Sequence, residues 1–151
     1  MRYSHKLSDA VHILAYIVIY HDGDLSSTAI AASVESNPGL IRRLMAALRT
    51  AGLLATQRGT ATPTLTRQPA EISLLDIYRA VEPADQLLHI DDRTNPQCIV
   101  GGNIQETLRG AYAQVQQAAE QELATITLAA VIDDIWRREQ STTGQATNCY
   151  G

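Results

Sequence analysis

The chain has 151 residues and a formal net charge of −4 at pH 7. Because a domain holds roughly 100 to 200 residues, this length excludes two large domains. The composition, 45% hydrophobic and 19% charged, supports an ordinary core and excludes wholesale disorder. The charge is uneven: residues 1–67 hold seven basic and four acidic residues (+3), and residues 68–151 hold five and twelve (−7). The acidic chain therefore contains a basic half.

Cysteine content and hydropathy indicate where the protein works. Only Cys98 and Cys149 are present. Two distant cysteines are no disulfide framework, so we expect a reducing cytoplasm. The apolar run 10–20 is well short of the ~20 residues that cross a bilayer. Asp22 and Asp24 separate this run from the small residues that follow, so we expect neither a signal peptide nor a membrane partner.

Hydrophobic periodicity predicts a mostly helical chain. Apolar residues recur at helical spacing in several segments, and the first of these is apolar nearly all round, which predicts burial on most sides. Helices are expected at about residues 7–20, 26–33, 38–50, 74–82, 104–126 and 128–138. Segments 53–57 and 64–67 predict two short strands around a polar turn. The polar segment 139–151 is expected to be a disordered tail.

Capping residues stand at the starts of the two helices that follow the first one. Ser26 or Ser27 offers an N-cap oxygen to the short second helix. Asn37 or Ser36 can cap the third helix. Pro38 suits its first position, because a helix start leaves that N–H unpaired anyway.

The later helices carry similar signals. Ser73 and Asp76 have the spacing of a capping box, in which a hydroxyl and a carboxylate three residues later pair with each other's backbone. Pro83 closes that helix, and Thr127 can cap the last one.

Helix, turn, helix and hairpin in this order, within the basic half, are the layout of a winged helix-turn-helix. We therefore expect a mainly helical fold with a small β-hairpin wing, in which residues 1–82 form a DNA-binding domain. Residues 83–138 would form a linker loop, a long dimerisation helix and a closing helix. The tail at 139–151 would follow.

The third helix has two distinct faces. On a wheel of 100° per residue, the apolar side holds Ile41, Leu44, Met45 and Leu48, and the opposite side holds Gly39, Arg42, Arg43, Ala46 and Thr50. Small residues let a helix approach the groove floor, and guanidinium groups contact guanine edges or phosphates. The expected DNA-binding residues are Tyr3, Lys6, Ser26, Ser27, Thr28, Asn37, Pro38, Gly39, Arg42, Arg43, Ala46, Arg49, Arg58 and Thr60.

The long helix predicts dimerisation. Its apolar or small residues form one stripe along about 23 residues, roughly 34 Å. Packing within one chain is the alternative, but the N-terminal domain is too small to cover such a helix, so a second subunit is expected. Two-fold pairing would place the third helices of the two subunits, which serve as recognition helices, about 34 Å apart. This distance is one turn of DNA. The expected interface residues are Ile104, Leu108, Ala111, Tyr112, Val115, Ala119 and Leu123.

Several short motifs carry a family resemblance. They are Met1-Arg2-Tyr3-Ser4 with Lys6 and Asp9-Ala10; Ser36-Asn37-Pro38 with Ile41-Arg42-Arg43-Leu44; Leu48 with Ala51-Gly52-Leu53-Leu54; Ile72-Ser73-Leu74 with Asp76-Ile77 and Ala80-Val81-Glu82; and Ile126-Thr127-Leu128. Over residues 1 to about 138 the chain resembles the bacterial Rrf2 family of winged helix-turn-helix regulators, which includes iron-sulfur assembly, nitric-oxide-sensing and cysteine-metabolism repressors. The resemblance implies a repressor that binds double-stranded DNA at a pseudo-palindromic operator as a homodimer.

The chain departs from this family at two places. Family wings usually carry a glycine-rich turn after the arginine, whereas Arg58-Gly59 is followed here by Thr60-Ala61-Thr62-Pro63. Many members bind an iron-sulfur cluster through three closely spaced cysteines before the long helix, and here only Cys98 stands there. One thiolate cannot supply that ligand set. We expect no iron-sulfur cofactor and no other metal.

Cys98 is a possible redox sensor. It lies just before the long helix, whose positive end favours a reactive thiolate. Oxidation there would shift the recognition helices and abolish DNA binding. The alternative is a structural thiol packed under the loop, because Asp91 and Asp92 would raise the pKa of Cys98. Cys149, in the tail, would react without consequence.

Two other functions compete with DNA binding. His89 could serve as the base for a Cys98 nucleophile, or could bind a metal with Asp91 and Asp92. Such pairs arise by chance in chains of this size, so we expect no enzyme. The stronger rival is a dimeric winged-helix module that binds protein rather than DNA.

Overall fold

The computed structural model describes residues 4–56, 62–83 and 86–142. Its elements are α1 (Lys6–Ile19), α2 (Ser27–Val34), α3 (Pro38–Thr50), β1 (Leu54–Thr56), β2 (Pro63–Leu65), a 3-10 turn (Pro69–Glu71), α4 (Leu74–Val81), α5 (Ile104–Thr125) and α6 (Leu128–Ser141). The two strands are antiparallel, with Leu54 opposite Leu65 and Thr56 opposite Pro63. The mainly helical fold with a two-stranded wing is the one that the sequence predicts.

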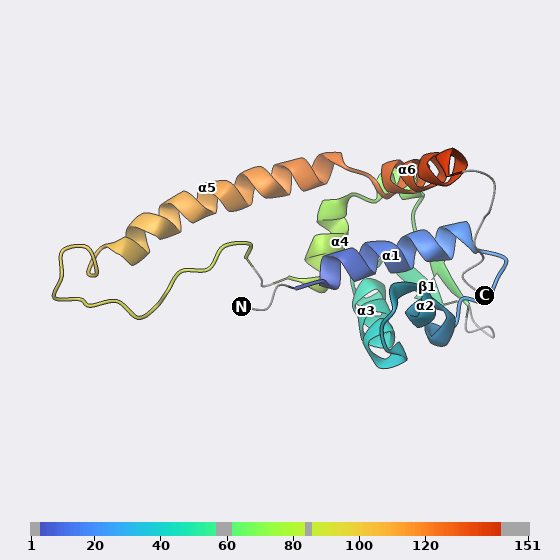
Figure 1. Ribbon diagram of the computed structural model, residues 1–151, viewed down its shortest axis with the longest axis horizontal. Coiled ribbons are helices and arrows are strands. Elements are labelled where there is room, and N and C mark those ends of the chain that lie inside the picture. Colours follow the sequence, from blue (N-terminus) through green and yellow to red (C-terminus); the bar gives the residue numbers. More distant parts are fainter. Residues whose placement is uncertain (1–3, 57–61, 84–85, 143–151) are drawn as a thin grey trace.

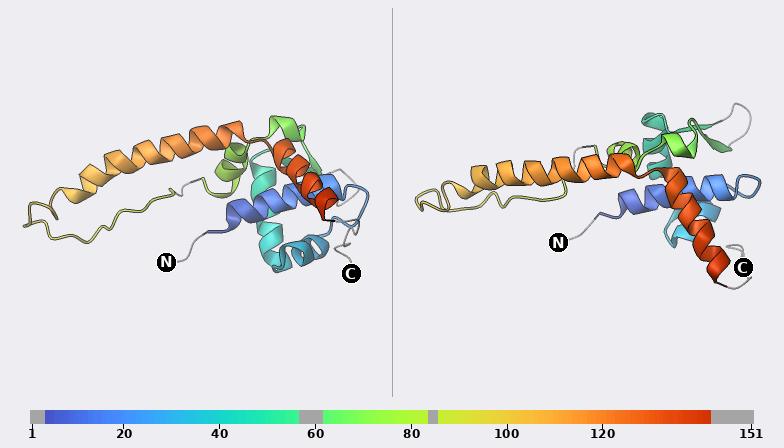
Figure 2. Two further views of the ribbon diagram at one scale, coloured as in Figure 1. Left: turned by 45° about the horizontal axis from the view of Figure 1, so that its top comes forward. Right: turned by 90° about the horizontal axis from the view of Figure 1, so that it is seen from above.

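The chain forms a body and an arm (Figure 1). The body contains α1 to α4, the two strands and α6. The arm consists of α5 and the loop 86–103, which runs beside the helix and turns back at its far end (Figure 2). None of the 22 residues of α5 is buried. Within the described residues, no helix is both long and apolar enough to cross a membrane.

Helix α1 lies at the centre of the body. Six consecutive or closely spaced residues are buried: Ala10, Ile13, Leu14, Ala15, Tyr16 and Ile17. This confirms the expectation that the helix is buried on most sides, because elements pack against several of its faces. Helices α2, α3, α4 and α6 and strand β1 contribute most of the rest of one continuous core. The core thus holds α2 and α3 at defined angles to α1.

Helix α4 begins with the predicted capping box. The Asp76 N–H donates to Ser73 Oγ at 3.1 Å, and the Ser73 N–H donates to Asp76 Oδ2 at 3.0 Å. These two bonds satisfy donors that a helix start would otherwise leave unpaired. The segment before α4 then pairs with the segment before α6: Leu74 N–H donates to the Ile126 carbonyl at 2.8 Å. The end of the arm is therefore tied to the body.

Helix α6 returns to the body and extends further than expected. Leu128 and Ile132 are buried in the same core as α1, although the sequence grouped this helix with the linker and the arm. The helix ends at Ser141, three residues beyond the expected boundary at 138. Asp134 pairs with Arg138 at 2.6 Å, and the Thr142 hydroxyl donates to the Arg138 carbonyl at 2.7 Å. These local bonds stabilise a polar last turn that has no apolar periodicity.

Candidate nucleic-acid interface

Helix α3 presents one apolar and one basic face. Ile41, Leu44, Met45 and Leu48 are buried against the core, which is the side that the helical wheel assigns to packing. Arg42, Arg43, Ala46, Arg49 and Thr50 are exposed. Because the apolar face is anchored, the arginines project from a rigid element. Ala46 lies between these arginines, and its small side chain would let the helix come close to the floor of a DNA groove.

The start of α3 is a capped helix end. Asn37 Oδ1 accepts the Leu40 N–H at 2.8 Å, so Asn37, one of the two predicted candidates, is the cap. Pro38 occupies the first turn, as predicted. A Cβ built on Gly39 would lie 3.2 Å from Asn37 Oδ1, so a larger residue would crowd the cap. The positive end of this helix favours an anion such as a phosphate.

Helix α2 and the turn after it set the position of α3. The Ala29 N–H donates to Ser26 Oγ at 3.2 Å, which makes Ser26 the N-cap of α2. Ser26 and Thr28 are exposed and Ser27 is half-buried. At the other end, Glu35 adopts a left-handed conformation with φ of 56°, a region that favours glycine. This residue reverses the chain sharply before Asn37.

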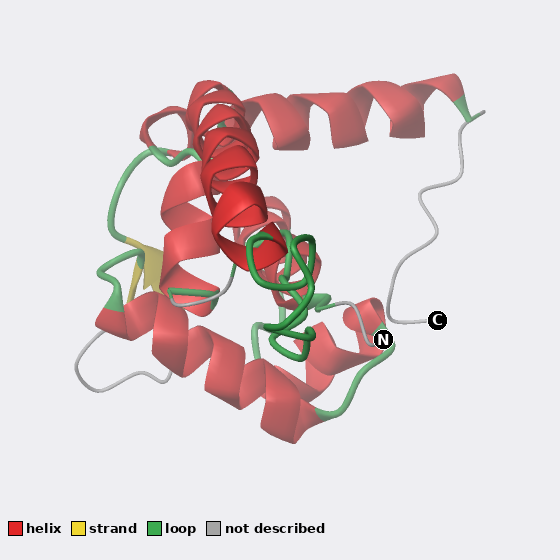
Figure 3. Cartoon of the chain, turned by 90° about the vertical axis from the view of Figure 1, so that its left-hand side faces the viewer, coloured by secondary structure: helices red, strands yellow, loops and turns green. Residues whose placement is uncertain are grey.

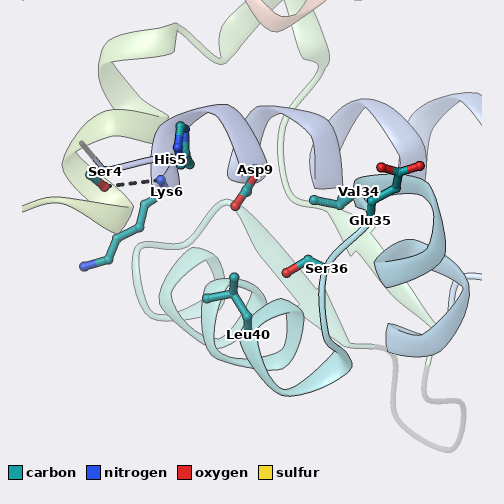
Figure 4. Close-up of a pocket in the computed structure, with 8 residues that line it drawn as sticks. All are labelled: Ser4, His5, Lys6, Asp9, Val34, Glu35, Ser36 and Leu40. Carbon is teal, nitrogen blue, oxygen red and sulfur yellow. Dashed lines mark hydrogen bonds between the residues drawn. The ribbon is translucent and has the colours of Figure 1, made fainter. Parts of the chain in front are cut away.

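Lys6 lies near the recognition helix, at the start of α1. A cavity of about 460 Å³ separates the first turn of α1 from the turn between α2 and α3. Asp9 and Ser36 are directed toward this space, and the Lys6 side chain extends away from it (Figure 4). Lys6 is exposed, so its ammonium group is accessible to a partner that contacts α3. Tyr3 lies outside the described residues.

The wing contributes two strands, β1 and β2. Arg58 and Thr60, both predicted to contact DNA, stand between them in the sequence and lie outside the described residues. Arg67 follows β2 and contacts the body instead: its Nη1 lies 3.6 Å from Asp76 Oδ2 and donates to the Glu71 carbonyl at 3.2 Å. Arg67 therefore connects the end of β2 to α4. The sequence showed only its charge and not these partners.

The predicted dimer stripe on α5 divides into two sets. Five of its residues are half-buried against elements of the same chain, namely Ile104, Leu108, Tyr112, Ala119 and Leu123, while Ala111 and Val115 are exposed. Gln116 was missing from the stripe, yet it accepts the Leu87 N–H at 3.0 Å and donates to the Tyr78 hydroxyl at 3.3 Å. The loop and α4 thus cover one side of α5, and the other side is open.

Cys98 is exposed at the far end of the arm. The backbone N–H groups of Gly101 and Val100 donate to its sulfur and lower the pKa of the Cys98 thiol. Hydrogen bonds to the charged form favour the thiolate. Asp91 and Asp92 do not reverse this direction, and the exposure contradicts the alternative of a thiol packed under the loop. Cys149 lies outside the described residues.

The described residues contain no group of three or more His, Cys, Asp or Glu side chains that could hold a metal ion. This part of the chain offers Cys98 as its single thiol. A [2Fe–2S] or [4Fe–4S] cluster needs about four protein ligands. The donor set around Cys98 therefore does not fit such a cluster.

Comparison with known proteins gives matches over nearly the whole chain. The family described as Rrf2, iron-dependent transcriptional regulator, matches residues 3–134. The candidate HTH-type transcriptional regulator YwnA of Bacillus subtilis is 38% identical over 131 residues, which are 87% of this chain and 97% of that protein. A crystal structure of a candidate DNA-binding protein is 38% identical with a TM-score of 0.69, covering 84% and 98% of the two chains. The structure of IscR from T. potens shares the fold at 24% identity and a TM-score of 0.65, covering 97% and 94%.

Proposed function

The chain belongs to the Rrf2 family and is a DNA-binding transcriptional regulator, not an enzyme; from this premise we propose that it binds a pseudo-palindromic operator as a homodimer. In this proposal the α3 helices of two protomers enter successive major grooves on one side of the DNA. The observation that carries it is the exposed face of α3, with arginines on an element whose opposite face is buried.

Each exposed residue has an expected kind of contact. Arg42 and Arg43 project from the centre of α3, where a guanidinium can form two hydrogen bonds to a guanine. Phosphates are the expected partners of Lys6, of Arg49 and of the hydroxyl residues at the start of α2. Arg58 and Thr60 on the wing are proposed to reach the backbone or the minor groove. The alternative of a protein-binding module is disfavoured, because the family and the 38% identical relatives are described as transcriptional regulators or DNA-binding proteins.

The homodimer is proposed from the open side of α5. A helix of 22 residues without a buried residue projects from the body, and Val115 is 48% exposed in the middle of it. A second α5 in antiparallel orientation would cover this side of both helices. The contact would be isologous, as two-fold dimers require.

Substitution of α3 tests the DNA-binding residues. A duplex taken from upstream of the gene's own reading frame is titrated with the parent protein and with the Arg42→Ala and Arg43→Ala variants. Each loss of a base contact should weaken binding by about 1–3 kcal/mol and relax specificity at one position. Arg137→Ala is the matched control, because Arg137 is exposed on α6, away from α3. Equal affinity of all four proteins would contradict the proposed interface.

Light scattering tests the dimer. Val115→Glu would bury two unpaired carboxylates in the interface, which is costly enough to split it. Gln114→Glu adds the same charge at the neighbouring exposed position and is expected to leave the dimer intact. A dimeric, folded Val115→Glu protein would remove this side of α5 from the interface.

Two finer points complete the proposal. We propose that the regulator is a repressor that responds to oxidants through Cys98, which the lowered pKa of the thiol and its exposure support. We also propose that it carries no iron-sulfur cluster, because one thiolate does not supply the ligands. Protein purified without oxygen should then lack the visible absorbance of such a cluster.

A further inference from the structure

The base of the arm is attached to the body at one place. The short connection between α5 and α6 pairs with the segment before α4: the Leu74 N–H donates to the Ile126 carbonyl and the Leu128 N–H donates to the Ile72 carbonyl, each at 2.8 Å. Helix α6 leaves this connection in a different direction from that of α5 (Figure 3, and Figure 2, right). One attached end does not fix the direction of a long helix, so a second attachment has to set it.

Gln116 supplies this second attachment. Its Oε1 accepts the Leu87 N–H at 3.0 Å, and its Nε2 donates to the Tyr78 hydroxyl at 3.3 Å. Three segments therefore meet at this side chain, namely α5, α4 and the start of the loop of the arm. Gln116 stands ten positions before Ile126, which is about 15 Å along the helix. Two attachments this far apart fix the direction of the arm relative to the body.

The body side of the Gln116 contact is rigid. Tyr78 is only 4% exposed, and Ile77 beside it is fully buried in the core. Helix α4, which carries both residues, packs on α1, on α3 and on α5. Gln116 itself is half-buried, and a hydrogen bond that is partly shielded from water is stronger than an exposed one. The direction of the arm is therefore coupled to the position of α3 through α4.

This coupling has a consequence for the proposed homodimer. There the open side of α5 contacts the partner, whereas α3 belongs to the body. The angle between arm and body then determines the separation of the two α3 helices. One base pair more between the half-sites moves them apart by about 3.4 Å and turns them by about 35°. A change in the angle of the arm therefore favours a different spacing of half-sites.

We propose that Gln116 is a positioning residue that determines which spacing of half-sites the regulator accepts. The inference rests on the proposed homodimer and names a residue that sets its specificity. Gln116 does not touch the DNA: it holds the arm at one angle, and the arm holds the two α3 helices at one separation. A loosely attached arm adapts to several spacings at a lower cost.

Enrichment of DNA from a random pool tests the inference in the full chain. Random-sequence duplexes are enriched on the parent protein and on Gln116→Met, which keeps a long side chain and removes both hydrogen bonds. Sequencing gives the spacings between paired half-sites. We expect one dominant spacing for the parent and several for the variant. Gln117→Met is the matched control, because Gln117 is the exposed neighbour on the same helix, and it should keep the spacing of the parent.

Titration converts this difference into a fold-change. Each protein is titrated with two labelled duplexes from the enriched pool, one with the preferred spacing and one with a base pair added between the half-sites. A hydrogen bond changes an equilibrium constant by about fivefold. The ratio of the two dissociation constants should therefore fall by about that factor in Gln116→Met. Equal weakening on both duplexes would leave the ratio unchanged and would show that Gln116 contributes only to stability.

Tyr78→Phe provides an independent test of the contact. It removes one of the two hydrogen bonds of Gln116, so the ratio should fall by a smaller factor. The combined Tyr78→Phe, Gln116→Met variant should give the ratio of Gln116→Met alone, because the shared bond can be lost only once. Circular dichroism checks that each variant is folded. Additive changes in the combined variant would contradict direct coupling between the two side chains.

Two further outcomes separate this inference from the homodimer. A parent protein that is monomeric in light scattering and enriches single half-sites refutes the homodimer and the role of Gln116 with it. A dimeric parent whose Gln116→Met variant keeps the same dominant spacing refutes the role of Gln116 and leaves the homodimer standing.

Discussion

Replacement of Asn37 by Asp should weaken DNA binding without lowering the stability of the protein. Asn37 Oδ1 accepts the Leu40 N–H at 2.8 Å at the start of α3, and an aspartate keeps an acceptor at this place. A negative charge at a helix N-terminus stabilises by typically 0.3–1 kcal/mol. We therefore expect the free energy of unfolding of Asn37→Asp to be equal to that of the parent protein or up to about 1 kcal/mol higher.

The same carboxylate should repel DNA if the start of α3 faces a phosphate. Two unit charges 4 Å apart interact with about 1 kcal/mol in water and more when partly desolvated. With two half-sites, the cost is about 2 kcal/mol, a roughly thirtyfold rise in the dissociation constant. Urea unfolding measures the first effect, and fluorescence anisotropy with a labelled operator at low salt measures the second.

Asn37→Ala is the matched comparison. It removes the cap without adding a charge, which costs about 1 kcal/mol of stability and lowers the melting temperature by roughly 2–4 °C. Its DNA affinity should fall less than that of Asn37→Asp. An Asn37→Asp protein that bound the operator as tightly as the parent would refute the argument that the start of α3 approaches the DNA backbone.

Four further predictions use other parts of the chain. Operator affinity should fall steeply with salt, with a log–log slope of about −0.9 for each phosphate neutralised, and a flat dependence would contradict the arginine face. Alkylation of Cys98 should reach half of its maximal rate at a lower pH than that of an ordinary thiol, since backbone N–H groups lower its pKa; Gly101→Ala, which disrupts this turn, should move the midpoint up again. If oxidants still abolish operator binding by Cys98→Ser, Cys98 is not the sensor. Glu35→Gly should stabilise the protein by about 1 kcal/mol in thermal unfolding, because Glu35 has a φ of 56°; a lower melting temperature would show that the Glu35 side chain contributes more than its backbone costs.

The features of α3 were predictable because they depend on neighbours in the sequence. Its period of 3.6 residues separates Ile41 and Leu44 from Arg42 and Arg43, and a cap needs only an acceptor before the first turn. The same is true of the capping box at Ser73. Interactions between residues three or four positions apart depend on the local sequence alone, so they can be predicted without knowledge of the fold.

Contacts between distant segments could not be predicted in this way. Periodicity shows that Leu128 and Ile132 are apolar, but it does not show that their partners belong to α1 and not to the arm. For the same reason, the sequence shows the positive charge of Arg67 but not that Asp76, nine residues later, is its partner. The stripe on α5 combines residues that pack on their own loop with residues such as Val115 that remain open.

The uneven charge of the chain has a geometric consequence for DNA binding. Helix α3 lies on one side of the body, and α5 and α6, which belong to the half of the chain with a balance of −7, lie on the opposite side (Figure 1). The Debye length at physiological salt is about 8 Å, so carboxylates on the far side are largely screened from DNA that contacts α3. At low salt this screening weakens, and the acidic side repels DNA that approaches it. In the proposed complex, DNA would therefore approach the α3 side, and the non-specific affinity would come from few basic residues. Under this proposal, base contacts by Arg42 and Arg43 would supply a large share of the preference for the operator.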